Sequence, residues 1–319
     1  MLCLKNANGF IAEFSPMGAS LHRFLVPDAD GSLTNLILTP ADPMAPRSEC
    51  AYAGAIIGPL AGRVRDAEIH VKGHVIHLDA NDGNNHLHGG THGLSDVVWE
   101  VKQYDHQQVT FGTFQPDGLG GYPGNRTFEV TYLLNDANTL RIILTAHSDQ
   151  PTFFNPSTHI YWNLSGDMAE SIGQHMLRIP ADKVMYNRAD HTMEHFESVD
   201  GTVFDFRKPK QIGDALKETG DRQIQISRGI NHLFAIHKPA EEHNESYVSL
   251  LHAPTHRELQ VSASLPCQWV YSGGYLDSSG MAVAFEPQHI AQAFDLTGER
   301  GHHTLLSKCS ERIDFRLLA

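Results

Sequence analysis

Two runs of alternating apolar and polar residues, joined by a short polar turn, are the strongest constraint on how this chain can fold. Apolar residues occupy every second position in residues 128–134 and again in residues 140–146. Successive side chains of a β-strand point to opposite faces, so this spacing predicts two strands that each bury one face. Residues 135–138 between them are Asn-Asp-Ala-Asn, and Asn and Asp favour turns. The segment therefore predicts an antiparallel β-hairpin packed on a core.

Further strand patterns recur along the chain, whereas helical periodicity is scarce. Residues 259–265 alternate in the same way, and residues 69–75 predict a second hairpin that turns at Lys72 and Gly73. Residues 211–218 predict one short helix. Turn residues interrupt the strands at short intervals, without a linker or a fixed-period repeat. We therefore predict an all-β fold, a large sandwich that forms a single domain over residues 1–319.

Charge and hydrophobic content exclude several classes of protein. Hydrophobic residues make up 41% of the chain and charged residues 19%, a balance that builds a core and excludes a disordered chain. The formal net charge is −13 and no basic run occurs, so we expect neither a nucleic-acid partner nor an anionic membrane. The longest uncharged apolar stretch, residues 51–62, is shorter than the roughly 20 residues that cross a bilayer. With no secretory signal visible, we expect a cytoplasmic protein with four reduced cysteines.

Histidine is unusually frequent, with 21 residues, and three histidines lie close together in the sequence. His86 and His88 are separated by one residue, so in an extended chain they would face the same side, and His92 follows. Such a set could hold a metal ion, but a metal site needs three or four converging ligands. In the alternative interpretation, one imidazole binds a loop backbone and the other is solvated. The sequence leaves both open.

Residues 154–164 combine aromatic rings with hydrogen-bonding side chains, among them His159 and Tyr161. This mixture suits a sugar, because aromatic faces cover the apolar C–H patches of a pyranose while polar groups bind its hydroxyls. The alternative is a core strand that carries one satisfied histidine.

Glu286 follows the apolar residues 282–285 and precedes Pro287, which favours an extended backbone at the end of a strand. Partial desolvation in these surroundings would raise the carboxyl pKa toward the range of a general base. The alternative is a salt bridge at the rim of the fold.

Eight motifs follow one another along nearly the whole chain. They are residues 58–64, 84–90, 121–124, 155–166, 205–207, 229–234, 271–277 and 285–289. In combination they resemble the aldose 1-epimerase (galactose mutarotase) family. The resemblance implies a large β-supersandwich of the galactose mutarotase type. It also implies an isomerase that binds a free monosaccharide in an open cleft and interconverts its α and β anomers, without cofactor or metal. We expect a monomer or a homodimer.

The resemblance also implies roles for individual residues. Opening a sugar ring requires a base at the anomeric hydroxyl and an acid at the ring oxygen. By match to the family, Glu286 is the base and His159 the acid. Arg63 and His88 match the family's sugar-binding arginine and histidine, and Tyr161 is a further candidate for substrate binding.

Several positions depart from the family pattern, among them Thr158 and Gly274, and two further ones bear on substrate binding. Where the family commonly has Tyr-Asp-His-Asn-Phe, this chain has Ile-Asn-His-Leu-Phe in residues 230–234, so Asn231 replaces a carboxylate. The family's glutamine two residues before a tyrosine is Trp269 here. We expect Asn231 and Trp269 to contact the substrate, the chemistry to persist, and the preference for galactose or glucose to have changed.

Three alternatives stay open at this point. The first is a non-catalytic carbohydrate-binding or regulatory protein on the same fold. The second is an epimerase for a sugar phosphate, which would need several Arg or Lys side chains around the cleft. The third is a metal-dependent enzyme that uses His86, His88 and His92.

Overall fold

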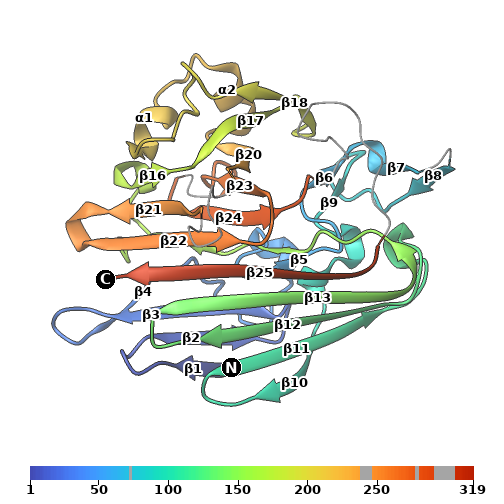
Figure 1. The fold of residues 1–319 in the computed structure, drawn as a ribbon, viewed down its shortest axis with the longest axis horizontal. Helices are drawn as coiled ribbons and strands as arrows, with labels where there is room; N and C mark the ends of the chain where they lie inside the picture. Colours follow the sequence, from blue (N-terminus) through green and yellow to red (C-terminus); the bar gives the residue numbers. More distant parts are fainter. Residues whose placement is uncertain (72–73, 238–245, 277–279, 291–305) are drawn as a thin grey trace.

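Antiparallel strands dominate the chain. The computed structural model describes residues 1–71, 74–237, 246–276, 280–290 and 306–319. These residues include two short α-helices, α1 (Ile212–Leu216) and α2 (Arg222–Ser227), which lie together at the top of the molecule in Figure 1. Helix α1 falls within the segment predicted to be helical, and the all-β prediction is confirmed. None of the described helices is both long enough and apolar enough to span a membrane. All four cysteines are free thiols, as expected.

The largest sheet of the described chain has nine strands. In their order across the sheet these are β10 (Glu100–Tyr104), β11 (Gln108–Gln115), β12 (Arg126–Leu134), β13 (Thr139–Thr152), β25 (Leu306–Leu318), β22 (Arg257–Ala263), β21 (Val248–His252), β16 (Met176–Arg178) and β19 (Lys210–Gln211). Strands β10 to β13 and β25 run side by side across the lower half of Figure 1. Strands β12 and β13 form the predicted hairpin, with Leu134 paired to Leu140 across the turn.

Smaller sheets complete the described part of the fold. A six-stranded sheet has the order β15 (Tyr161–Trp162), β24 (Val283–Gln288), β23 (Cys267–Tyr271), β20 (Asn231–Ile236), β17 (Ala181–Asn187) and β18 (Met193–Ser198). A four-stranded sheet has the order β1 (Leu2–Lys5), β2 (Ile11–Ser15), β3 (Ser20–Pro27) and β4 (Leu33–Asn35). The two-stranded ladders pair β14 (Ser157–Thr158) with β5 (Ile56–Ile57), β6 (Arg63–Val64) with β9 (His86–Leu87), and β7 (Glu68–Val71) with β8 (His74–His77). The last pair is the second predicted hairpin, and its turn at Lys72 and Gly73 lies outside the described residues.

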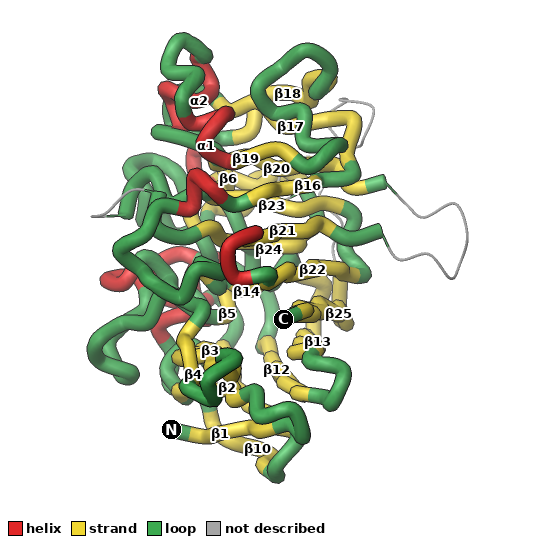
Figure 2. The backbone as a smooth tube through the Cα atoms, turned by 90° about the vertical axis from the view of Figure 1, so that its left-hand side faces the viewer, coloured by secondary structure: helices red, strands yellow, loops and turns green. Residues whose placement is uncertain are grey.

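The six-stranded sheet has two different faces. Phe234 and Phe285 on one face belong to the same buried cluster as Val130 and Phe315 of the nine-stranded sheet. Trp162 of β15 lies with its ring centroid 5.3 Å from that of Phe315, so the two sheets are in direct contact. Because side chains alternate along a strand, the residues between these positions point away from this shared core. In the side view of Figure 2, the helical segments lie to the left of the stacked strands.

Arg126, at the start of β12, is fully buried and holds the loop that precedes it. Its guanidinium donates hydrogen bonds of 2.6 to 3.2 Å to the backbone carbonyls of Pro116, Leu119, Tyr122, Pro123 and Gly124. Buried carbonyls without a donor are costly, so one side chain satisfies the polar backbone of an entire loop.

Replacing this arginine by an apolar side chain is therefore expected to destabilise the fold. For Arg126→Met we expect the free energy of unfolding to fall by about 3 kcal/mol, because several buried carbonyls lose their donor together. Urea denaturation measures this loss. Arg23→Met is the control, since Arg23 is half exposed, makes one ion pair with Glu13 and should cost less than about 1 kcal/mol. Equal losses in the two variants would contradict the assigned role of Arg126.

Candidate active site

The face of the six-stranded sheet that points away from the shared core gathers most of the predicted site residues. Trp269 on β23 and Glu286 on β24 are direct partners in the strand register. Asn231 on β20 is paired in the same way with Tyr271 on β23. Tyr161 on β15 lies in one buried cluster with Trp269 and Tyr271. Strand pairing thus brings together side chains from four strands that are far apart in the sequence.

His159 and Glu286 form a buried pair at the centre of this face. The Nε2 atom of His159 lies 3.4 Å from Oε1 of Glu286, and the two side chains are 5% and 3% exposed. The His159 amide donates to the carbonyl of Ala55, and the His159 carbonyl accepts from the amide of Gly54. Nδ1 of His159 is buried with no hydrogen-bond partner in the described chain, which argues against a merely structural histidine. The burial of Glu286 likewise argues against a salt bridge at the rim.

Burial governs the ionisation of this pair. Desolvation disfavours charged forms, so it raises the pKa of Glu286 to about 8 and lowers that of His159 to about 4. The positive charge of Arg63 acts in the opposite direction on Glu286 and lowers its pKa. Between these two values the coupled pair holds one proton. Two touching groups that share one proton can act as acid and base in the same reaction.

His88 lies against the other side of His159, with ring centroids 5.4 Å apart and the rings perpendicular. Its Nδ1 accepts a hydrogen bond of 3.1 Å from the amide of Gly62. A neutral imidazole carries a single N–H, so Nε2 holds the proton and can only donate. Burial is the main reason why the pKa of His88 is well below its ordinary value, and this neutral form therefore persists. His88 presents a hydrogen-bond donor to the site.

The three neighbouring histidines of the sequence do not form a metal site. Both ring nitrogens of His86 are engaged, one by a backbone carbonyl and the other by the hydroxyl of Tyr122, each at 2.7 Å. His92 is exposed. The expectation that His86 and His88 face the same side is wrong, because His88 and Gly89 have φ angles of 50° and 98° and the chain is not extended there. His86 instead lies against the Tyr122 ring.

A different trio could hold a metal ion by distance alone. His88, His159 and Glu286 each offer one atom within 4.8 Å of the others, and no other such group occurs in the described residues. Metal ligation by a histidine requires a nitrogen lone pair. The only lone pair of His88 faces the Gly62 amide, so its Nε2 has none to offer. The geometry therefore favours proton transfer over metal binding.

Arg63 supplies a guanidinium beside the acid–base pair. Its Nε donates to Asp82 at 2.6 Å, and its other N–H groups have no hydrogen-bond partner within the described ranges. Arg63 is paired with Leu87 in the β6–β9 ladder, and His88 follows directly after β9. The hydrogen bond between Tyr122 and His86 ties this ladder to the Tyr122 side chain.

The remaining predicted residues form one wall of the site. The indole Nε1 of Trp269 donates to Oδ1 of Asn231 at 2.5 Å. Tyr161 is 1% exposed, and its hydroxyl donates to the carbonyl of Ala51 at 3.1 Å. Its ring centroid lies 4.8 Å from that of His159, so it packs against the histidine. Substrate contact by Tyr161 stays a prediction.

Two aromatic residues that were not among the predicted site residues also contact the pair. Tyr52 packs against His88 and His159, with ring centroids 4.7 and 5.9 Å away. The Tyr271 ring centroid lies 6.3 Å from that of His159. The alternation of Trp269 and Tyr271 along one strand could have revealed Tyr271. Tyr52 lies in an irregular loop and leaves no such pattern.

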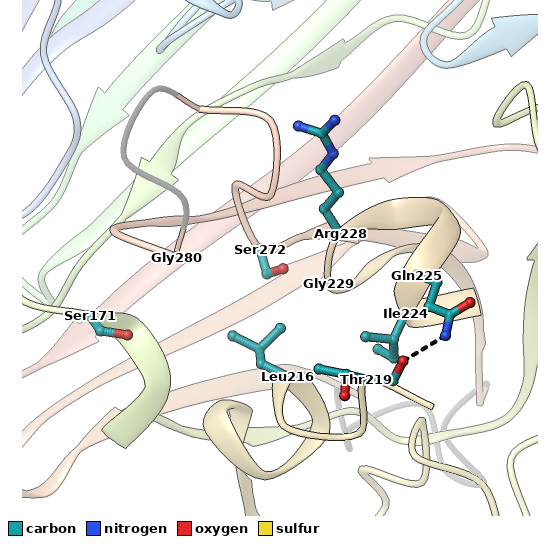
Figure 3. Close-up of a pocket in the computed structure, with 9 residues that line it drawn as sticks. All are labelled: Ser171, Leu216, Thr219, Ile224, Gln225, Arg228, Gly229, Ser272 and Gly280. Atoms are coloured by element: carbon teal, nitrogen blue, oxygen red, sulfur yellow. Dashed lines mark hydrogen bonds between the residues drawn. The ribbon is translucent and has the colours of Figure 1, made fainter. Parts of the chain in front are cut away.

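A hollow with a volume of about 390 Å³ lies beside α1 and α2 (Figure 3). Within it, Gln225 donates to the carbonyl of Thr219 at 2.7 Å, the hydrogen bond that Figure 3 marks. Arg228 is the one ionisable side chain among the labelled residues, and its guanidinium carbon lies 4.8 Å from the ring centroid of Tyr275. Because this hollow lacks an acid–base pair, we place the chemistry at His159 and Glu286.

Comparisons with known proteins identify the family of the chain. The family model described as aldose 1-epimerase matches residues 1–299. An aldose 1-epimerase from Escherichia coli strain K12 is 30% identical over 278 residues, which cover 86% of this chain and 79% of the relative. A galactose mutarotase from Homo sapiens is 32% identical over 277 residues, which cover 85% of this chain and 78% of the relative.

Solved structures show the same architecture. An aldose epimerase homologue from C. elegans superposes with a TM-score of 0.87 at 25% identity, over 99% of this chain and 98% of the other. A galactose 1-epimerase from Lactobacillus acidophilus NCFM superposes with a TM-score of 0.85 at 28% identity, over 99% and 93%. The predicted sandwich of the galactose mutarotase type is confirmed.

Proposed function

The chain belongs to the aldose 1-epimerase family, and we propose that it interconverts the α and β anomers of a free aldose by acid–base opening of the sugar ring. The observation that carries this proposal is the buried contact of 3.4 Å between Nε2 of His159 and Oε1 of Glu286. We assign Glu286 as the base and His159 as the acid. A monosaccharide partner, a cytoplasmic location and a monomeric or homodimeric state stay predictions.

The proposed reaction moves one proton at each of two sugar oxygens. Glu286 removes the proton of the anomeric hydroxyl while protonated His159 delivers a proton to the ring oxygen, and the bond between C1 and the ring oxygen breaks. Rotation about C1–C2 then presents the other face of the new carbonyl. Ring closure reverses both transfers: Glu286 gives its proton to the carbonyl oxygen, and His159 takes its proton back from the oxygen that closes the ring.

At rest the shared proton favours Glu286, whose pKa is the higher of the two. A sugar hydroxyl that donates to the carboxylate stabilises its charged form, as the charge of Arg63 already does. The proton then moves to His159 and produces the reactive form. The N–H groups of His88 and Arg63 are available to hold sugar oxygens or to stabilise charge on the ring oxygen.

The site favours a free aldose over a sugar phosphate. A phosphate dianion calls for several unpaired cationic side chains. Among the described residues, Arg63 is the cation that acts on Glu286, and it is already paired with Asp82.

Polarimetry on freshly dissolved α-anomers of several aldoses tests the proposal. We expect the approach to anomeric equilibrium to accelerate in proportion to enzyme concentration for at least one aldose. Folded protein that leaves every aldose at its uncatalysed rate would refute the proposed activity, and sugar binding measured on the same sample would then select the non-catalytic alternative.

A further inference from the structure

The hydrogen bond between Trp269 and Asn231 fixes which way the Asn231 amide lies. An indole N–H can only donate, so the group that faces it must be the oxygen Oδ1, and the two atoms lie 2.5 Å apart. The opposite orientation would bring two donors together. The Asn231 backbone is held as well, since its carbonyl accepts from Nδ2 of Asn187 at 2.8 Å. The amide nitrogen Nδ2 of Asn231 must therefore point elsewhere.

That nitrogen is available to a ligand. Nδ2 of Asn231 donates to no group in the described part of the protein, and it is not among the buried polar atoms that lack a partner. The residue is 8% exposed, and Trp269 is 6% exposed. The Asn231 side chain thus presents an N–H donor at the surface of the site, while its oxygen is bound by Trp269.

This donor borders the acid–base pair. Trp269, which holds the Asn231 amide, is the strand partner of Glu286. Tyr271, the strand partner of Asn231, lies against His159. A sugar whose anomeric carbon reaches the pair therefore has a neighbouring ring substituent within range of the same wall. His88 and Arg63 also border the pair, and each carries N–H groups without a protein partner in the described residues.

We propose that Trp269 and Asn231 form a specificity device that selects an aldose through a hydrogen-bond acceptor. One ring substituent of the substrate accepts a hydrogen bond from Nδ2 of Asn231 and does not need to donate one. The substrate class is an aldose with an acceptor oxygen at that position, whether it belongs to a hydroxyl, an ether or a carboxylate. This inference rests on the proposed function, because it concerns the sugar bound at the same site.

Deoxy and deoxyfluoro aldoses separate the two roles of a hydroxyl. Fluorine accepts a weak hydrogen bond and cannot donate, whereas hydrogen does neither. Calorimetric dissociation constants at anomeric equilibrium do not depend on turnover, so the test remains valid even if the protein proves not to be catalytic. For wild type we expect one ring position that is recognised as an acceptor. Replacing its hydroxyl by fluorine should weaken binding by less than about threefold, whereas replacing it by hydrogen should weaken binding by about tenfold.

Two variants test whether the amide orientation causes this pattern. In Asn231→Asp the new carboxylate still accepts a hydrogen bond from the Trp269 indole. It has no N–H group, so it can bind the sugar only as a hydrogen-bond acceptor. We expect the fluoro sugar to lose about tenfold in affinity relative to the hydroxyl sugar, compared with less than about threefold in wild type. Trp269→Phe removes the indole donor and frees the amide to turn, so the discrimination between fluorine and hydrogen should largely disappear. Asn8→Asp adds the same charge on the exposed loop between β1 and β2 and should leave the pattern unchanged.

Several results would overturn the inference. Equal losses for fluoro and deoxy sugars at every ring position of wild type would show that no substituent is recognised as an acceptor only. An unchanged pattern in Asn231→Asp, or full discrimination in Trp269→Phe, would show that the oriented amide is not the cause. If Asn231→Asp does not fold, the Trp269→Phe result decides alone.

Discussion

Glu286→Gln is expected to lower kcat/KM for anomer interconversion roughly 10²–10⁴-fold, because an amide of nearly the same shape cannot take up the proton of the anomeric hydroxyl. Polarimetry on the preferred aldose measures the loss. Glu197→Gln is a matched control: Glu197 also faces a histidine, His195 at 3.7 Å, but this pair is about half exposed on β18. The control should keep wild-type activity. Wild-type rates in Glu286→Gln would remove Glu286 from the mechanism.

The same substitution should raise stability at alkaline pH. Burial raises the pKa of Glu286 from 4.5 in the reference state to about 8 in the folded protein. The resulting contribution to stability is fully present below the reference value and is lost as the pH rises through the folded value. Glutamine does not ionise, so Glu286→Gln should gain in melting temperature over wild type between pH 5 and pH 9. A variant that is equally destabilised at both pH values would indicate a structural role instead.

His159→Gln is expected to reduce kcat roughly 10²–10⁴-fold with little change in KM, because glutamine keeps a hydrogen-bond donor toward Glu286 but cannot deliver a proton. The pH dependence provides the sharper readout. Wild-type kcat/KM should be bell-shaped, falling below about 4, where both groups are protonated, and above about 8, where the pair has lost its proton.

The variant should lose this shape. Without the histidine, the residual reaction needs only the ionised carboxylate, so its rate should rise with pH through the range in which the wild-type rate falls. His147→Gln, an exposed substitution on β13, is the control and should keep the bell-shaped pH dependence of kcat/KM. A bell-shaped pH dependence in His159→Gln would show that another group is the acid, and His88 is a neighbouring candidate.

Sequence patterns predicted the strands better than the way in which the strands meet. The alternation in residues 128–146 predicted the β12–β13 hairpin, because burial of one face leaves a period of two in the sequence. That Trp269 stands beside Glu286 depends on the register between β23 and β24, which neither strand encodes alone. The motifs assigned His159 and Glu286 separately, and only the fold shows that they touch.

The histidines show a second limit of sequence patterns. The spacing of His86 and His88 predicted a shared side, but the positive φ of His88 sends the two rings to different environments. A non-glycine residue in that conformation is held there by its surroundings and leaves no signature in composition. The tautomer of His88 is likewise set by the amide of Gly62, which is distant in the sequence. Orientation and protonation are therefore properties of the folded chain.

The two faces of the six-stranded sheet divide its positions into independent sets. Val270 and Phe285 belong to the core that joins the large sheets, whereas Trp269 and Glu286, one residue away on the same strands, line the site. A substitution in the second set leaves the first in place. A library that varies only positions 231, 269 and 271 should therefore yield folded proteins with different sugar preferences. The fold thus offers a practical starting point for engineering mutarotases that accept unnatural aldoses.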